Sequence, residues 1–296
     1  MSDKSGIAWT NATWNPVTGC TKVSQGCKHC YAEREWARLS ANPKATAYYG
    51  RDFTDVACHE DRLGQPLRWS KQRLIFVNSM SDLFHEDVPD EFIDLVFSVM
   101  ALAERHTFQV LTKRPERMRD YMTVHVDQRD SALHIANVWL GVSIEDQATA
   151  DERIPLLLQT PAAVRWVSAE PLIGPIDMDE CPVGMSGPLR PYGGTGTDTP
   201  KLDWIVVGGE SSVSGARPMR AEWVRKLRWD CKKAGVPFFM KQLGAAFVDE
   251  KNGIAGAGLK VDPDVECVIS RRLHDRAGAY IEEWPEDLLV REWPST

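Results

Sequence analysis

Residues 74–113 contain two short apolar runs separated by one helical pattern: LIFVNSMSDLFHEDVPDEFIDLVFSVMALAERHTFQVLTK. The runs that begin at Leu74 and Phe108 are continuous rather than alternating, which is typical of strands buried on both faces of a parallel sheet. Apolar residues between the runs recur at helical spacing, at Phe92, Val96, Val99 and Leu102. The stretch therefore predicts one strand–helix–strand unit.

Similar apolar runs recur along most of the chain, at intervals of roughly 30 residues that suit one strand–helix unit. Four further runs begin at Asn137, Val164, Asp203 and Val236, and an earlier strand within residues 7–14 would make seven. We expect an α/β fold, a full or partial βα barrel with parallel strands. An open doubly wound sheet is the alternative.

The domain organisation predicted from this pattern is a barrel over residues 1–248 with a small C-terminal extension over 249–296. Residues 178–202 are rich in Gly, Pro and Thr and are predicted to form a flexible insertion within the barrel. Trp284 and Trp293 are candidate anchors of the extension.

Composition predicts a soluble cytoplasmic protein. Of 296 residues, 43% are hydrophobic and 26% charged, and the net charge of -7 gives no general attraction to nucleic acid. The polar opening MSDKSGIAWTN contains no export signal, and no apolar stretch is long enough to cross a membrane. In a reducing compartment, the seven cysteines are expected to serve a metal or redox site rather than disulfides.

Polar residues end the predicted strands, and the carboxyl ends of barrel strands build the site of such folds. These residues are Asn78, Ser79 and Asp82; Lys113 and Arg114; Ser143 and Glu145; Ser168 and Glu170; Glu210 and Ser211; Lys241 and Gln242. Gly208 and Gly209 would let backbone amides approach a ligand closely. The repetition predicts a shared polar chamber, and the presence of both charge signs favours a zwitterionic or mixed-charge ligand.

Three of the seven cysteines lie within eleven residues, in GCTKVSQGCKHC at residues 19–30. Soft thiolates select zinc, copper(I) or iron–sulfur clusters. A structural zinc site needs a fourth ligand, for which the nearest candidates are His29, Cys58 and His59. Cys20, Cys27 and Cys30 alone suit a four-iron cluster with one open iron. Both metals remain open on spacing and placement.

Seven segments of the chain together resemble the phage-associated three-cysteine-motif family, long known as a domain of unknown function in phages and bacteria. They are WNPVTGCTKVSQGCKHCYAE (14–33), VNSMSDLFH (77–85), VLTKRPERM (110–118), WLGVSIEDQ (139–147), VSAEPLIGPI (167–176), VVGGESSVSGARPM (206–219) and FFMKQLG (238–244). That family in turn is similar to divergent radical S-adenosylmethionine (SAM) enzymes, which have a full or partial barrel.

The resemblance implies that Cys20, Cys27 and Cys30 hold a [4Fe–4S] cluster whose open iron binds SAM. It also implies radical chemistry, a reductant such as flavodoxin or ferredoxin, and a location in the host cytoplasm if the protein is phage-encoded. The substrate is unknown. A nucleic-acid base or nucleotide is a candidate because the family is associated with phages.

The chain departs from the superfamily pattern at two places. Six residues rather than three separate Cys20 from Cys27, and the Gly-Gly-Glu stretch follows a late strand instead of the second one. Either Ser79 and Asp82 contact the amino group of SAM, or Glu210 reaches it across the barrel. The candidate cofactor-binding residues are Ser79, Asp82, Ser143, Glu145, Glu170, Gly208, Gly209 and Gln242. The candidate catalytic residues are Lys113, Glu210 and Lys241, the two lysines also being candidates for a carboxylate or phosphate.

A different function class remains open from the sequence. In it, zinc or an iron–sulfur cluster only braces the barrel, and the protein is a phage accessory protein that binds nucleic acid or a partner. The basic segment TKRPERMR, residues 112–119, is then the candidate phosphate contact.

Overall fold

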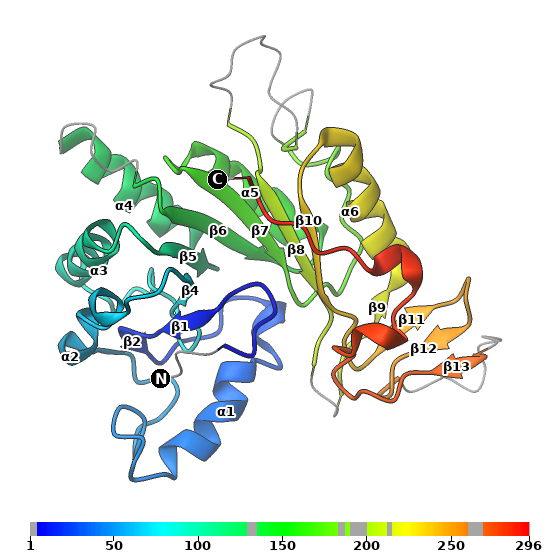
Figure 1. Cartoon of the computed structure of the whole chain (residues 1–296), viewed down its shortest axis with the longest axis horizontal. Coiled ribbons are helices and arrows are strands. Elements are labelled where there is room, and N and C mark those ends of the chain that lie inside the picture. The colour runs from blue at the N-terminus through cyan, green and yellow to red at the C-terminus, as the bar shows by residue number, and fades with distance from the viewer. Residues whose placement is uncertain are drawn as a thin grey trace. The chain divides into compact units, whose positions relative to one another are not determined.

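The computed structural model describes residues 5–128, 135–182, 187–189, 200–211, 215–259 and 269–295 (Figure 1). Much of the insertion expected at residues 178–202 therefore lies outside the described residues. The chain divides into two compact units, Met1–Val142 with Gln159–Arg165, and Ser143–Leu158 with Trp166–Thr296. The domain boundary expected between residues 248 and 249 stays a prediction.

All seven strands expected from the sequence are present in the main parallel sheet. They are β1 (Ala12–Trp14), β4 (Leu74–Val77), β5 (Thr107–Thr112), β6 (Val138–Ile144), β7 (Val164–Ala169), β8 (Trp204–Gly208) and β10 (Phe238–Gln242). Their order in the sheet, β1-β4-β5-β6-β7-β8-β10, follows the chain without reversal. A doubly wound sheet would reverse its strand order at a switch point. The fold is therefore a partial βα barrel, and the doubly wound alternative is wrong.

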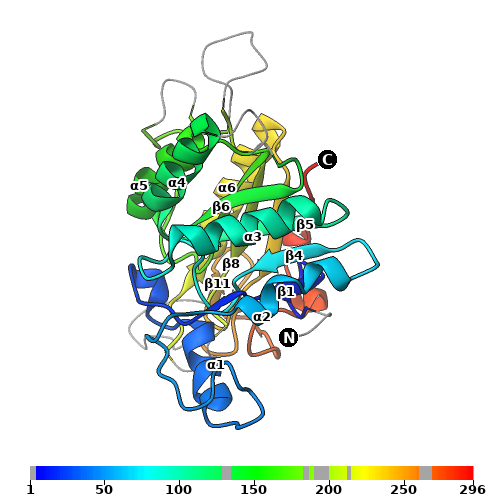
Figure 2. The same ribbon diagram turned by 90° about the vertical axis from the view of Figure 1, so that its left-hand side faces the viewer.

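Helices α3 (Asp90–Leu102) and α4 (Pro115–Gln128) follow β4 and β5 in the first unit, and α3 runs along these strands (Figure 2). The predicted helical stripe is confirmed at Phe92 and Val96, which are buried. Leu102, however, is 73% exposed, because the buried face of α3 runs through Phe97 and Met100 instead.

Shorter elements of the first unit lie before β4. They are β2 (Val17–Thr18), the 3-10 helix η1 (Gln25–Cys27), α1 (Tyr31–Ser40), β3 (Ala57–Cys58), α2 (Glu60–Leu63) and the 3-10 helix η2 (Pro66–Arg68). Strands β2 and β3 pair antiparallel. Helix α1 packs Trp36 edge-on against Tyr48 and Phe53, which fixes the helix behind the cysteine loop.

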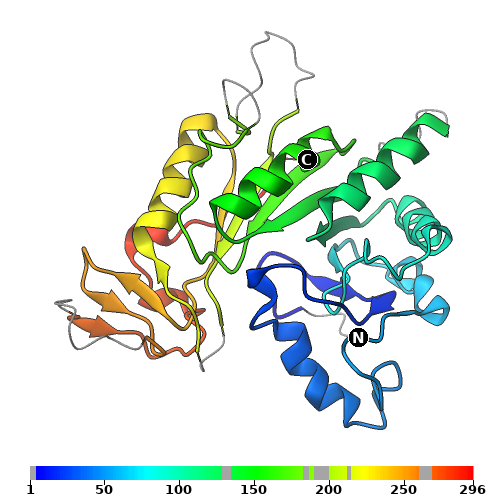
Figure 3. The ribbon, with the colours of Figure 1, turned by 180° about the vertical axis from the view of Figure 1, so that it is seen from behind.

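The second unit contains helices α5 (Gln147–Gln159) and α6 (Ala221–Ala234). Helix α6 ends at Gly235, which takes the left-handed conformation with φ 69° that is common at helix C-caps. This helix contacts β10 and reaches a small sheet beside it (Figure 3). The small sheet consists of β9 (Met219–Arg220), β11 (Phe247–Asp249), β12 (Ile254–Ala255) and β13 (Arg271–Arg272).

Two 3-10 helices, η3 (Ile281–Glu283) and η4 (Glu286–Leu288), complete the second unit. Both candidate anchor tryptophans contact this unit. Trp284 is buried and its Nε1 donates to the Gly278 carbonyl at 3.0 Å, and the Trp293 ring lies 4.9 Å from that of Phe239. Among the described residues, no helix combines the length and the apolar composition that crossing a membrane requires.

Candidate functional site

The cysteine loop begins at Gly19, where the backbone passes very close to a neighbouring segment. Gly19 has φ 93°, and a Cβ at this position would lie 2.3 Å from the Asp55 carbonyl oxygen. Its N–H donates to the Met80 carbonyl at 3.2 Å, which places the loop against the segment that follows β4. In the chain, the loop follows β2, which comes after β1 of the main sheet.

All three cysteines of the loop are free thiols that are partly exposed. The N–H of Cys20 donates to the Phe53 carbonyl at 2.9 Å, Cys27 ends η1 and Cys30 is the N-cap of α1. Short helical elements therefore fix the second and third cysteines, while a backbone hydrogen bond fixes the first.

Three soft thiol donors from one loop fit an iron–sulfur cluster by their chemistry. The described part of the chain contains no group of three or more His, Cys, Asp or Glu side chains already arranged to hold a metal ion. His59, a candidate fourth zinc ligand, has its Nε2 2.7 Å from Thr18 Oγ1. Burial and the neighbouring Arg62 and Arg51 lower the pKa of His59 to about 4. By its chemistry the set of three thiols fits a three-cysteine cluster, and the thiols would have to converge around it.

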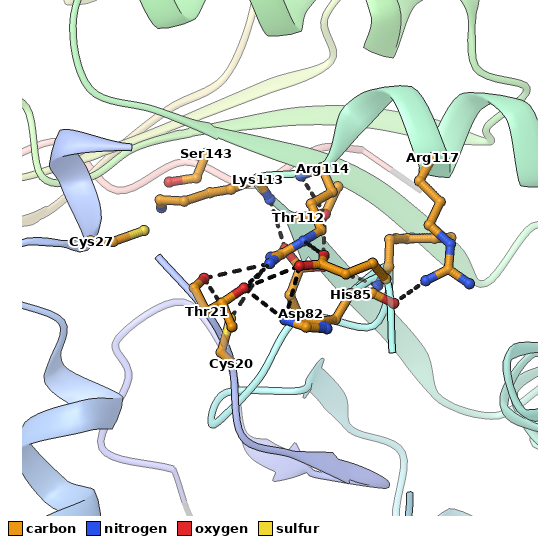
Figure 4. A network of polar contacts seen from close by, with 12 residues as sticks. Cys20, Thr21, Cys27, Asp82, His85, Thr112, Lys113, Arg114, Arg117 and Ser143 are labelled. Atoms are coloured by element: carbon orange, nitrogen blue, oxygen red, sulfur yellow. Dashed lines mark hydrogen bonds and ion pairs between the residues drawn. The ribbon is translucent and has the colours of Figure 1, made fainter. Parts of the chain in front are cut away.

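Arg114 joins this loop to the carboxyl ends of β4 and β5 (Figure 4). Its Nη1 lies 3.8 Å from Cys20 Sγ and 3.4 Å from Asp82 Oδ2. Its Nη2 donates to Thr21 Oγ1 at 2.8 Å, and its Nε donates to Glu86 Oε2 at 2.7 Å. The Arg114 and Asp82 side chains are only 10% and 8% exposed, so their ion pair is shielded from water, whereas Glu86 is 61% exposed.

Asp82, predicted to bind the cofactor, is occupied by hydrogen bonds within the protein. Its Oδ1 accepts from Thr112 Oγ1 at 2.7 Å and from the Phe84 N–H at 3.0 Å. Its Oδ2 accepts from the Lys113 N–H at 3.0 Å and from Arg114. Buried carboxylates need such partners, so these contacts give Asp82 a structural role in holding Arg114.

The charges of this network shift three pKa values. Burial, together with the nearby Asp82 carboxylate, raises the pKa of the Cys20 thiol to about 12, although Arg114 acts in the opposite direction. The hydrogen bond from Arg114 lowers the pKa of Glu86 to about 2. Burial lowers the pKa of Arg114, but Asp82 and Glu86 outweigh that effect and raise it. Arg114 therefore stays charged beside the thiol.

Ser79, the other candidate contact of the SAM amino group, also has partners within the first unit. Its Oγ donates to Asn15 Oδ1 at 3.1 Å, and its carbonyl accepts a hydrogen bond from the Tyr31 hydroxyl. The preceding Asn78 has φ 59°, a conformation that Asn tolerates better than most residues. Asn78 Oδ1 accepts from the Val17 N–H at 3.3 Å, which ties the end of β4 to the approach of the cysteine loop.

In the second unit, Lys241, Gln242 and Glu170 lie together at the carboxyl ends of β10 and β7. Lys241 Nζ is 2.5 Å from Glu170 Oε1, and Gln242 Nε2 donates to the Gly209 carbonyl at 2.8 Å. The register of β10 against β8 shifts between Met240 and Gln242. Such bulges re-aim side chains and are common beside active sites. The Lys241 and Glu170 side chains keep 19% and 18% of their surface exposed.

The glycine pair allows close backbone packing at the same strand ends. A Cβ on Gly209 would lie 2.4 Å from the Leu243 carbonyl oxygen, and one on Gly208 would lie 3.3 Å from the Glu170 carboxyl group. The glycines therefore make room for protein groups. Glu210 forms an ion pair with the Arg217 side chain and accepts from the Arg217 N–H at 2.7 Å.

Ser143 and Glu145 are buried at the end of β6. Ser143 Oγ donates to the Glu170 carbonyl at 3.2 Å. Glu145 is fully buried and pairs with the buried Arg153 at 3.3 Å, and Arg153 also donates to the Ser143 carbonyl at 2.7 Å. Removing one partner of a buried pair is costly, so this pair holds the end of the strand in place.

The arginines of the basic segment 112–119 are each paired with carboxylates of the chain. Arg117 Nη2 lies 2.7 Å from Asp90, and Arg119 Nη2 lies 2.6 Å from Asp120. Arg114 is paired with Asp82 and Glu86. These internal partners do not favour the segment as a phosphate-binding surface.

Sequence reasoning missed the partners that organise both groups of strand-end residues. The sequence indicates Arg114 as a polar residue at the end of a strand, but it does not predict the contact of Arg114 with Cys20. Arg153 and Arg217 were not singled out at all. The sequence does contain one indication of these two partners. Arg153 follows Glu145 by eight residues, and Arg217 follows Glu210 by seven.

Replacement of Gly19 by alanine is expected to destabilise the first unit by about 1–3 kcal/mol, because alanine would be strained at φ 93° and would clash with Asp55. Urea denaturation of the metal-free protein measures this change. Gly64→Ala is the matched control, since a Cβ at Gly64 meets nothing within 4 Å. Equal stability of the two variants would show that the close approach at Gly19 does not constrain the loop.

Comparison with solved structures finds similarity to spore photoproduct lyase. A point mutant of that enzyme matches with a TM-score of 0.37 and 14% identity, over 58% of this chain and 48% of the other. The same enzyme complexed with dinucleoside spore photoproduct matches with a TM-score of 0.33 and 14% identity, over 52% of this chain and 44% of the other. The chain thus spans about half the length of the enzyme it matches.

No curated protein matches the sequence. The model of one protein family, described as a protein of unknown function (DUF5131), matches residues 4–283. Because this match covers nearly all of the 296 residues, the chain belongs to the DUF5131 family.

Proposed function

We propose that this protein is a radical-SAM-type enzyme in which Cys20, Cys27 and Cys30 hold a [4Fe–4S] cluster. One observation carries the proposal: a loop with three free thiols is bound, through Gly19 and Arg114, to the segments that follow β4 and β5. Barrel enzymes build their active sites at the carboxyl ends of the strands. The chain thus presents three thiol ligands, one fewer than a four-iron cluster has irons, beside the strand ends where such folds build their active sites.

When bound and reduced, the cluster would supply the electron that cleaves SAM to methionine and a 5′-deoxyadenosyl radical. The residues of the chain prepare this step by holding and shielding the ligands. Gly19 and the Cys20 N–H fix the start of the loop, and α1 fixes its end at Cys30. The three thiols must lose their protons to become ligands.

In the second unit, we propose that the residues at the strand ends bind a mixed-charge ligand in their own right, with SAM and the substrate as the candidates. The Lys241–Glu170 pair combines both charge signs, with Gln242 beside it. The other predicted site residues stay predictions: Ser79, Asp82, Lys113, Ser143, Glu145, Gly208, Gly209 and Glu210. The family resemblance makes a nucleobase or nucleotide the candidate substrate, and a base in duplex DNA would have to leave the stack to react.

Lys241→Met is expected to weaken SAM binding about tenfold or more, because the variant lacks a charged donor whose hydrogen bonds contribute about 1.5–3 kcal/mol. Calorimetric titration of the cluster-loaded protein with SAM measures the change. Lys233→Met is the matched control, since Lys233 lies on α6 over the Trp229 ring at 4.6 Å. Equal affinities in the two variants would remove Lys241 from the site.

The activity itself is tested by product analysis. The protein is purified without oxygen, loaded with iron and sulfide, and incubated with SAM and dithionite. We expect 5′-deoxyadenosine and methionine from the wild type and neither product from Cys27→Ala. Tightly bound zinc, with no iron uptake and no product, would instead favour a metal-braced barrel without radical chemistry.

A further inference from the structure

Arg114 contacts the cysteine loop at more than one atom. Its Nη1 lies within hydrogen-bond distance of Cys20 Sγ, at 3.8 Å. Its Nη2 donates to Thr21 Oγ1 at 2.8 Å and approaches the Thr21 carbonyl at 3.5 Å. The guanidinium therefore spans two consecutive loop residues, and one of them is a proposed cluster ligand.

Two carboxylates also contact the Arg114 guanidinium. Glu86 accepts from Nε at 2.7 Å and Asp82 lies 3.4 Å from Nη1. Thr112 Oγ1 in turn accepts from the Arg114 N–H at 2.8 Å and donates to Asp82 at 2.7 Å. A planar guanidinium held at several nitrogens keeps a fixed orientation, so the nitrogen that points at sulfur is pre-organised.

A thiolate bound to iron carries negative charge on its sulfur, and hydrogen bonds to cluster sulfurs and nearby charge tune the reduction potential. An N–H donor or a positive charge beside the sulfur stabilises the more negative, reduced state. Its removal should therefore lower the potential of the cluster.

Resting on the proposed function, we infer that Arg114 is the positioning residue of Cys20. It holds Cys20 and Thr21 in place before the cluster forms, and it donates an N–H to the Cys20 sulfur afterwards. This contact raises the reduction potential of the cluster, so that the cluster is reduced more easily.

The redox part is tested by potentiometry of the cluster-loaded protein, followed by electron paramagnetic resonance. Arg114→Met should have a more negative potential than the wild type, and Arg114→Lys, which keeps the charge but loses the planar fork, should lie between them. Arg119→Met is the matched control on α4, because Arg119 pairs with Asp120. Equal potentials in Arg114→Met and Arg119→Met would overturn the inference.

A second measurement on the metal-free protein separates this inference from the proposed function. The Cys20 N–H donates to the Phe53 carbonyl at 2.9 Å, so its hydrogen exchange reports the order of the loop. Loss of the charge-assisted contacts to Thr21 should speed this exchange about tenfold in Arg114→Met, and Arg119→Met should exchange like the wild type. Unchanged exchange in Arg114→Met would overturn the positioning role.

If the variant with methionine does not fold, Glu86→Gln serves in its place. This change weakens the hold on Arg114 at a side chain that is 61% exposed, and it should shift the potential and the exchange in the same directions by less. A wild type that takes up no cluster would defeat the proposed function and the redox part together, while the exchange experiment would still decide whether Arg114 positions the loop.

Discussion

Cys27→Ala is expected to abolish iron binding. The proposed cluster has three protein ligands, and Cys27 supplies one of them from the end of η1. Loss of an outer hydrogen-bond partner alone lowers metal affinity about 10–100-fold, so the loss of a ligand should exceed about 100-fold. Iron and acid-labile sulfide, determined after reconstitution and desalting, measure the change. Cys20→Ala and Cys30→Ala should behave in the same way.

Cys267→Ala is the control for this experiment, because Cys267 lies outside the loop in sequence and outside the described residues. It should bind as much iron as the wild type. Equal iron loss in Cys27→Ala and Cys267→Ala would discredit the ligand assignment, because it would mean that iron uptake depends on cysteine content in general.

Asp82→Asn is expected to destabilise the metal-free protein by about 3–5 kcal/mol, the usual cost of breaking a buried ion pair by removing one partner. Asp82 is 5% exposed, and its loss leaves the charge of Arg114 without its buried partner. An amide also offers only one acceptor oxygen to the donors that now share two. Urea denaturation monitored by circular dichroism measures the change.

Asp87→Asn is the matched control, because the Asp87 side chain is 63% exposed and lies 3.7 Å from His85 Nδ1. Exposed pairs contribute about 0–1 kcal/mol, so this variant should retain nearly all of its stability. If Asp82→Asn were as stable as the wild type but bound SAM poorly, Asp82 would be a cofactor ligand, as the sequence suggested, and not a structural carboxylate.

The strands of the sheet could be predicted because each is a continuous apolar run with polar ends. β6 illustrates this, since all seven of its residues are buried and only a strand covered on both faces tolerates such a run. The end of α6 could be predicted because Gly235 is the residue that most readily adopts the left-handed cap. These features depend on local sequence.

The site could be predicted only in part because its partners are distant or depend on backbone irregularities. Arg114 and Cys20 are 94 residues apart, and no local pattern indicates which carboxylates fix the arginine. The register shift between Met240 and Gln242, where Lys241 lies, arises from pairing between β8 and β10. Polar residue types at strand ends could be recognised from the sequence, but the hydrogen bonds that already occupy Asp82 and Glu210 could not.

Whether the three cysteines hold a cluster with an open iron is tested by electron paramagnetic resonance of the reduced, reconstituted protein with and without SAM. We expect a [4Fe–4S] signal that changes when SAM is added, because an open iron binds the cofactor. A cluster signal that SAM leaves unchanged, or tightly held zinc with no cluster signal, would contradict it and would make residues 19–30 a structural brace.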